Sequence, residues 1–151
     1  MQNLQYAKVF KQEYLLAFMN LAIVVSQWYW EEITRRMLDL AVQTAEKNGV
    51  TTEILKVPGC YDIPLAVKKL LKRKDIDGVV TLGAIVQGDT DHDRAIAYSI
   101  FPALTQLSLE FNKPVALGIT GPRMTMAQAV QRIPKAKLVM SACIEMVKTL
   151  K

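Results

Sequence analysis

The chain has 151 residues, of which 51% are hydrophobic, and a formal net charge of +5 at pH 7. This length can bury one core, so we expect a single domain over residues 1–151, and a domain of this size often gains stability by associating with copies of itself. Lys and Arg total 19 against 14 Asp and Glu, and outside a run at residues 68–74 the basic side chains are dispersed. Because no nucleic-acid recognition motif accompanies this charge, it argues against a nucleic-acid partner and suits small anionic molecules better.

Cysteine usage and hydropathy indicate the compartment. The two cysteines, Cys60 and Cys143, have neither metal-ligand spacing nor the density of a disulfide-stapled secreted domain. We therefore expect no metal site and a reducing compartment. No apolar run reaches the ~18 residues that a membrane span needs, and the amino terminus lacks the layout of a signal peptide. These features predict a cytoplasmic protein that has no membrane partner.

Residues 1–20 differ in pattern from the rest of the chain. Leu4, Tyr6, Lys8 and Phe10 alternate with other residue types, which is a weak signal of period two. This pattern is compatible with an extra edge strand or with an amino-terminal arm that reaches a neighbouring chain. Either interpretation favours a homo-oligomer.

Beyond residue 20, short apolar runs alternate with longer helical patterns. The apolar runs predict strands at residues 21–25, 52–57, 78–86 and 115–119. Helical spacing predicts helices at residues 33–45 and 63–72, a long helix that ends near residue 110 and is kinked or divided at Pro102, and helices at 125–132 and 134–150, with a turn at 120–122. Four strands joined by helical crossovers imply an α/β fold, a three-layer α-β-α sandwich of the flavodoxin-like class around a four-stranded parallel sheet.

His92 is the only histidine in the chain, and it follows the third predicted strand. A junction between a strand and a helix combines the backbone N–H groups of a helix start, which attract anions, with a rigid strand end. Gly83 and Gly88 let the backbone turn tightly or approach a ligand, while Thr90 or Asp91 can cap the following helix. An imidazole at this position could transfer protons in a reaction near neutral pH, although a surface histidine flanked by solvated aspartates would give the same pattern.

All four predicted strands end in unusual residues at the same edge of the sheet. These residues are 28–30, 58–62, the histidine loop and 120–123, and in a parallel sheet they should converge on one pocket. Aromatic planes such as Trp28 and Tyr61 suit a flat heterocycle, and the Asp62 carboxylate could accept hydrogen bonds from polyol hydroxyl or ring N–H groups. The tryptophans could instead be packing or interface anchors.

Two segments resemble the most characteristic stretches of the 6,7-dimethyl-8-ribityllumazine synthases of riboflavin biosynthesis. They are VPGCYDIPLA at residues 57–66 and LGAIVQGDTDH at residues 82–92. The resemblance extends from about residue 21 to residue 150, and GITGP at residues 118–122, followed by Met124-Thr125, looks most like the archaeal branch. Only residues 1–20 fall outside it.

The resemblance implies a transferase that needs no cofactor. Such an enzyme condenses 5-amino-6-ribitylaminopyrimidinedione with 3,4-dihydroxy-2-butanone 4-phosphate and releases phosphate and water. The family places its active sites between adjacent subunits of a homopentamer. These rings either remain separate or close into an icosahedral assembly of sixty subunits, and the sequence leaves that choice open.

The resemblance also implies roles for individual residues. Trp28 would stack on the pyrimidinedione, and His92 would transfer protons. Arg132 takes the position of an arginine that reaches the phosphate from the neighbouring subunit, with Lys137 as a second cation. The remaining substrate-binding positions are Cys60, Tyr61 and Asp62 on the ring and ribityl side, Ile85 and Val86 beside the heterocycle, Asp89 and Thr90 at the phosphate, and Leu117, where bacterial relatives often carry phenylalanine.

Departures from the family pattern keep alternatives open. The loop at residues 28–31 looks one residue longer than in the family, so either Trp28 or Trp30 could be the stacking ring. Gln87 stands where many relatives carry arginine, and three nearby aspartates put negative charge beside the phosphate position. The rival functions are an archaeal-type riboflavin synthase and a shell-forming or flavin-binding assembly without turnover.

Overall fold

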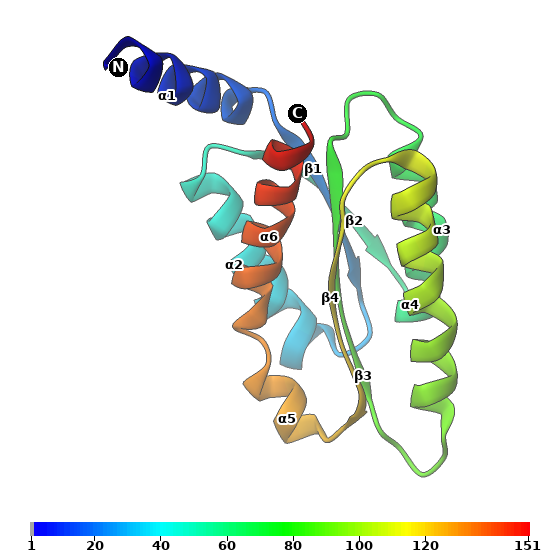
Figure 1. The fold of residues 1–151 in the computed structure, drawn as a ribbon. Coiled ribbons are helices and arrows are strands. Elements are labelled where there is room, and N and C mark those ends of the chain that lie inside the picture. Colours follow the sequence, from blue (N-terminus) through cyan, green and yellow to red (C-terminus); the bar gives the residue numbers. More distant parts are fainter. Residues whose placement is uncertain (1) are drawn as a thin grey trace.

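A four-stranded parallel sheet forms the middle layer of the protein, as Figure 1 shows. The computed structural model describes residues 2–151, with side chains for all of these except residues 2, 3, 12 and 15–17. The strands lie in the order β2-β1-β3-β4. Their bounds are Asn20–Ser26 for β1, Thr51–Val57 for β2, Gly78–Val86 for β3 and Val115–Met124 for β4.

Helices cover both faces of this sheet. On one face lie α2 (Arg35–Lys47), α5 (Met126–Gln131) and α6 (Lys135–Leu150), and on the other lie α3 (Ile63–Leu71) and α4 (His92–Phe111) (Figure 1). This arrangement confirms the predicted α/β three-layer sandwich. It also explains why β1 and β3 are continuous apolar runs, since a parallel strand between two helical layers is buried on both faces.

Side-chain alternation along β1 divides the core into two halves. Leu21, Ile23 and Val25 are buried against α2 and α6, whereas Ala22 and Val24 are buried against α3 and α4. Because all the strands run in the same direction, their carboxyl ends meet at one edge of the sheet, where ligands bind in folds of this type.

The end of β4 differs from the prediction. The dipeptide Gly121-Pro122 predicts a turn, but β4 continues to Met124 and stays paired with β3 across an irregularity between Ala84 and Val86. Gly121 permits this pairing, because a Cβ atom there would lie 2.3 Å from the backbone oxygen of Ile85 and its φ is +106°. The long helix α4 also runs undivided through Pro102.

The edge strand predicted as one alternative for the first residues is wrong. Gln2–Ala17 form a helix, α1, which extends away from the sheet in Figure 1. Helix-forming residues without Gly or Pro prevail over the weak alternation in this segment. The side chains of Tyr6, Phe10 and Tyr14 recur every four residues along α1 and are exposed. None of the helices in the described part of the chain is long and apolar enough to cross a membrane.

Candidate active site

A cavity of about 400 Å³ lies at the carboxyl ends of β1, β2 and β3, beside the first turn of α4. The structure therefore brings together three of the four strand ends that the sequence predicts to converge. Seven of the predicted site residues line this cavity: Trp28, Cys60, Tyr61, Ile85, Val86, Thr90 and His92. Tyr29, which belongs to the segment 28–30 predicted to lie at this edge, also lines the cavity, as do Asp93 and Ile96, to which the sequence assigns no role in the site.

The aromatic loop after β1 places one tryptophan at the cavity and the other away from it. The Trp28 backbone N–H donates to the hydroxyl of Ser26, which ends β1, over 3.2 Å, and 63% of the Trp28 residue surface is exposed. Tyr29 has a left-handed backbone (φ 58°), and its ring meets the Trp28 ring edge to face at 6.2 Å. Trp30 does not line the cavity. Its ring packs against the core and lies 4.2 Å below the ammonium of Lys56.

A π-helical turn follows the aromatic loop. It spans Trp30–Thr34, directly before α2. The Tyr29 carbonyl accepts hydrogen bonds from the backbone N–H groups of Ile33 and Thr34, at 2.9 and 3.0 Å. Such turns hold one more residue than an α-helical turn and are frequent at functional sites. This turn therefore connects the aromatic loop at the cavity directly to α2.

Cys60 forms an apolar part of the cavity wall. It is 7% exposed, and burial raises the pKa of its thiol to about 11, against smaller opposing effects of hydrogen bonds to Ser26 and the Ala84 carbonyl. A Cβ atom on Gly83 would lie 2.5 Å from the Cys60 sulfur, so the glycine in β3 gives the thiol its space. The thiol is therefore protonated at neutral pH, and it is poorly suited to act as a nucleophile there.

The Asp62 carboxylate is used locally and does not line the cavity. Its Oδ2 atom accepts the Gly59 backbone N–H over 2.9 Å and so closes the short turn Cys60–Asp62 before α3. The carboxylate remains exposed, which leaves acceptor positions open on both oxygens.

His92 is the first residue of α4, and its side chain is exposed at the cavity rim. Its backbone N–H donates to the Thr90 hydroxyl over 3.3 Å, an interaction that orders the chain just before the helix. The N–H groups of the first helical turn have no partner within the helix, so they can bind an anion there. Asp89 is exposed in the same loop, but it is not part of the cavity wall.

Asp93 is the buried acid of this site. The residue is 3% exposed, and its Oδ2 atom accepts the backbone N–H of Arg123 over 2.8 Å. This hydrogen bond, followed by those from the α4 backbone and the charge of Arg94, lowers the pKa of the carboxyl despite its burial. The second oxygen, Oδ1, has no hydrogen-bond partner among the described residues.

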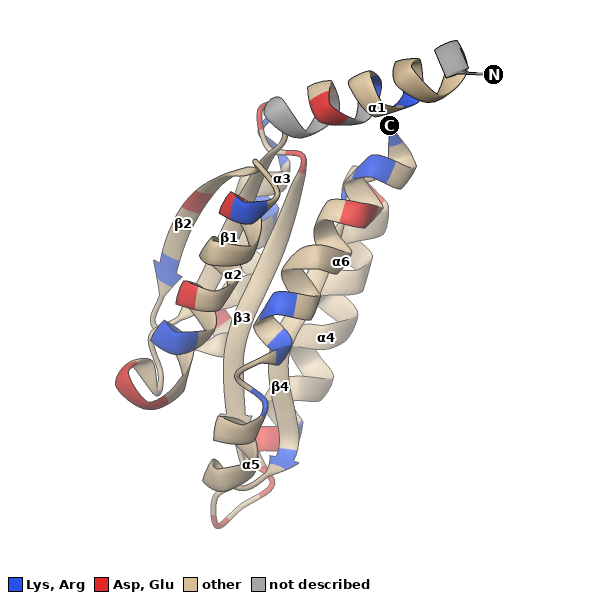
Figure 2. Cartoon of the chain, turned by 90° about the vertical axis from the view of Figure 1, so that its left-hand side faces the viewer, with Lys and Arg blue, Asp and Glu red and all other residues tan. Residues whose placement is uncertain are grey.

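The remaining predicted residues lie outside the cavity of this chain. Leu117 lines two other hollows beside β4. Arg132 donates to the Gln128 carbonyl over 3.1 Å, and Lys137 is exposed on α6. Figure 2 shows the basic positions of α6 on the face of the sheet opposite α4. Among residues 2–151, the side chains that line the cavity include no Lys or Arg.

Comparisons with known proteins identify the family of this chain. A sequence model of the family described as 6,7-dimethyl-8-ribityllumazine synthase matches residues 18–151. The protein of that name from Methanopyrus kandleri is 50% identical over 133 residues, covering 87% of this chain and 94% of its own. The one from Picrophilus torridus is 48% identical over 133 residues (87% and 97%), and the one from Methanocaldococcus jannaschii is 40% identical over 138 residues (91% and 97%). The chain therefore belongs to the 6,7-dimethyl-8-ribityllumazine synthase family.

Proposed function

We propose that this protein is a 6,7-dimethyl-8-ribityllumazine synthase. In this reaction 5-amino-6-ribitylaminopyrimidinedione condenses with 3,4-dihydroxy-2-butanone 4-phosphate, and phosphate and water leave. The observation that carries the proposal is the cavity itself, which combines an aromatic wall, the start of α4 and the histidine within one chain. We assign the reaction to one domain of residues 1–151, acting without a cofactor in the cytoplasm.

The apolar part of the cavity suits the pyrimidinedione. Trp28 supplies an exposed ring for stacking, while Ile85 and Val86 lie beside it at the end of β3. Cys60 and Tyr61 continue this wall. The exposed Asp62 carboxylate, next to Tyr61, would accept hydrogen bonds from the ribityl hydroxyls.

The polar end of the cavity suits the butanone phosphate. Backbone N–H groups near Asp89 and Thr90, together with the Thr90 hydroxyl, would hold the phosphate at the start of α4. His92, two residues further on, would transfer protons during imine formation, phosphate elimination and ring closure. Holding two well-oriented reactants together would itself lower the barrier by up to ~7–11 kcal/mol.

The missing cation is the reason to propose a homo-oligomer. Two phosphate charges beside Asp89 and Asp93 need compensation that the helix start alone does not provide. Arg132 and Lys137 do not line the cavity of their own chain. We assign them, with Leu117, to the cavity of the adjacent subunit in a homopentamer. A measurement of the mass of the protein in solution would show whether such rings stay separate or close into an icosahedral shell.

A product assay tests this function. Incubation with both substrates should yield 6,7-dimethyl-8-ribityllumazine and one phosphate per product. Release of riboflavin from lumazine alone would instead identify an archaeal-type riboflavin synthase. Binding of flavin or lumazine without any turnover would identify an assembly that has kept the fold and lost the reaction.

A further inference from the structure

The end of β4 is fastened to the loop that carries His92. The Gln87 backbone N–H donates to the Met124 carbonyl over 2.8 Å, and Gly121 approaches the Ile85 carbonyl too closely for any side chain. The third attachment is the bond from the Arg123 N–H to Asp93, which joins residues that are 30 positions apart in the sequence. The first two attachments are backbone contacts. Only the third uses a side chain, that of Asp93, and a substitution can therefore remove it.

The backbone of Arg123 adopts an unfavourable conformation that surrounding contacts must stabilise. Its φ is 61°, in the left-handed region that residues other than glycine rarely adopt. Sparsely populated conformations of this kind persist where surrounding contacts fix them, and they cluster at functional sites. The Asp93 carboxylate is such a contact, since it accepts the N–H of the left-handed residue itself.

We propose that Asp93 is a positioning residue: by holding the Arg123 backbone, it fixes the first turn of α4 and with it the imidazole of His92. The inference rests on the proposed function, because the position of His92 affects turnover only if His92 transfers protons in the reaction. Asp93 follows His92 directly in the first turn of the helix, and both residues line the same cavity.

Two features favour a positioning role over ordinary packing. One oxygen of this buried carboxylate has no hydrogen-bond partner among the described residues, and an unsatisfied buried polar atom calls for a functional explanation. The negative charge also sits in the first turn of α4, where the helix dipole stabilises it and strengthens its bond to an N–H donor. Replacing this bond by water or by nothing would loosen the first helical turn against β4.

A double-mutant cycle tests the coupling to His92. We expect Asp93→Ala to lower kcat about 10- to 100-fold, as a small misplacement of reacting groups does, while KM for the pyrimidinedione changes less than about twofold. In a His92→Ala background the same substitution should have no further effect on kcat. The matched control is Asp39→Ala, at an exposed aspartate on α2; we expect it to leave kcat unchanged.

Asp93→Asn separates the hydrogen bond from the charge and guards against misfolding of the alanine variant. Asparagine keeps an oxygen that can accept the Arg123 N–H, so kcat should stay within about threefold of the wild-type value. A loss of kcat as large as that of His92→Ala would overturn the proposal in favour of a direct role for the charge. Equal losses from Asp93→Ala with and without His92 would overturn it as well.

Amide hydrogen exchange provides a readout that does not depend on turnover. The Arg123 amide should exchange faster in Asp93→Ala than in wild type, and at the wild-type rate in Asp39→Ala. Unchanged exchange at Arg123 in Asp93→Ala would contradict the inference even in an active enzyme. If the wild-type protein forms no lumazine, the proposed function fails while the exchange experiment still decides whether Asp93 holds β4.

Discussion

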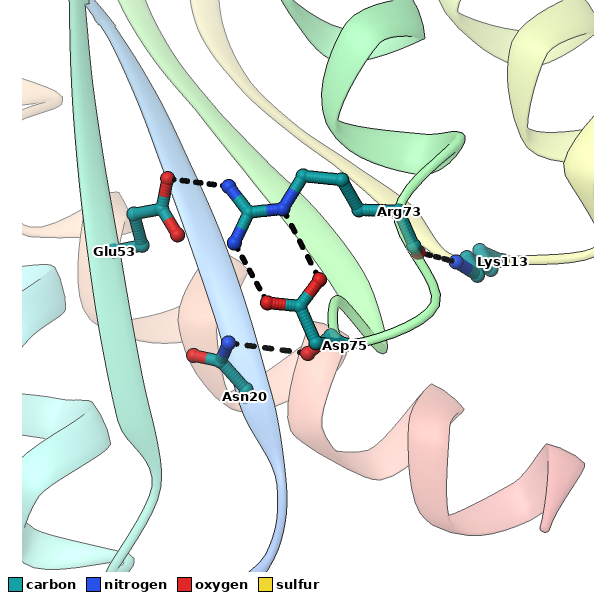
Figure 3. A network of polar contacts seen from close by, with 5 residues as sticks. All are labelled: Asn20, Glu53, Arg73, Asp75 and Lys113. Atoms are coloured by element: carbon teal, nitrogen blue, oxygen red, sulfur yellow. Dashed lines mark hydrogen bonds and ion pairs between the residues drawn. The ribbon is translucent and has the colours of Figure 1, made fainter.

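At the amino ends of the strands, side chains from distant segments pair with one another, whereas at the carboxyl ends they surround an open cavity. Figure 3 shows the paired end. Arg73 contacts Glu53 at 2.7 Å and Asp75 at 2.6 Å, and Lys113 donates to the Leu71 and Arg73 carbonyls at 3.0 and 2.6 Å. These bonds join the end of α3 to β2 and to the segment before β4. The Arg73 guanidinium also lowers the pKa of the Asp75 carboxyl.

The carboxyl ends contain features that do not favour stability. Tyr29 and Arg123 adopt left-handed backbones, Asp93 has an unpartnered oxygen, and Trp28 exposes most of its ring. In parallel α/β folds this edge binds ligands, and strain or unsatisfied polar groups concentrate at functional sites. From this difference we expect substitutions at the amino ends of the strands to change stability alone. Substitutions at the cavity should change binding and turnover. The predictions below test this division, from the largest expected effect to the smallest.

His92→Ala should cause the largest loss. Removing a positioned general acid–base group should lower kcat about 10- to 10⁴-fold, with some rate remaining from the proximity of the two substrates. Because the side chain is exposed, the melting temperature and the assembly should not change. Lumazine formation, measured beside thermal unfolding, checks both points; undiminished turnover would show that water or another group transfers the protons.

Trp28→Ala should weaken the binding of a flat heterocycle. Riboflavin is a suitable probe, because stacking on an indole quenches its fluorescence. We expect a loss of roughly 1–3 kcal/mol in binding free energy, judged from stacking energies of bases on aromatic side chains. Trp30→Ala is the matched control and should weaken binding less, since its ring packs under Lys56 and outside the cavity. The opposite ranking would make Trp30 the stacking residue.

Gly83→Ala should destabilise the fold at the cavity wall. The new methyl group would meet the Cys60 sulfur at 2.5 Å, and overpacking of this kind costs about 1–3 kcal/mol. Adding Cys60→Ala should restore part of the loss, because it removes the sulfur. Gly88→Ala, which meets nothing within 4 Å, is the control for stability. Denaturant unfolding measures the wild type, Gly83→Ala, Cys60→Ala, the double variant and Gly88→Ala; an additive double variant would contradict the predicted contact.

Lys113→Met should act on stability alone. It removes two hydrogen bonds to the carbonyls at the end of α3, for a loss of about 1–2 kcal/mol in unfolding free energy. The Michaelis parameters should stay unchanged, because the cavity lies at the opposite edge of the sheet. Lys72→Met, at an exposed position, is the control. A change in kcat with unchanged stability would contradict the assignment of stability to the amino ends of the strands and of turnover to the carboxyl ends.

Sequence patterns predict the buried parts of this protein better than its irregular ones. The strand at 78–86 and the histidine loop after it follow from a continuous apolar run and local glycines, and both are observed. Gly121-Pro122 carries the local pattern of a turn, yet pairing with β3 keeps it in a strand. Likewise, helix propensity overrides the alternation at residues 4–10.

The missed site residues share a physical reason. The Asp93 carboxylate accepts a backbone N–H group 30 residues away. Every residue except proline has such a group, so no residue type in the sequence reveals this partner. Tyr29 lies in the segment 28–30 that the sequence predicts to reach the cavity, but its left-handed backbone could not be predicted from a tyrosine. Arg132 was assigned by resemblance to the family, and the fold of one chain leaves it outside the cavity.

Mixing two inactive variants tests the central claim, that one chain offers an incomplete site and a second copy completes it. His92→Ala subunits keep Arg132, and Arg132→Ala subunits keep His92. If each site takes these residues from adjacent subunits, randomly mixed rings should regain about a quarter of the wild-type activity, since about one interface in four joins an intact pair. No recovery after mixing has been verified by native mass spectrometry would contradict the claim and assign the whole site to one chain.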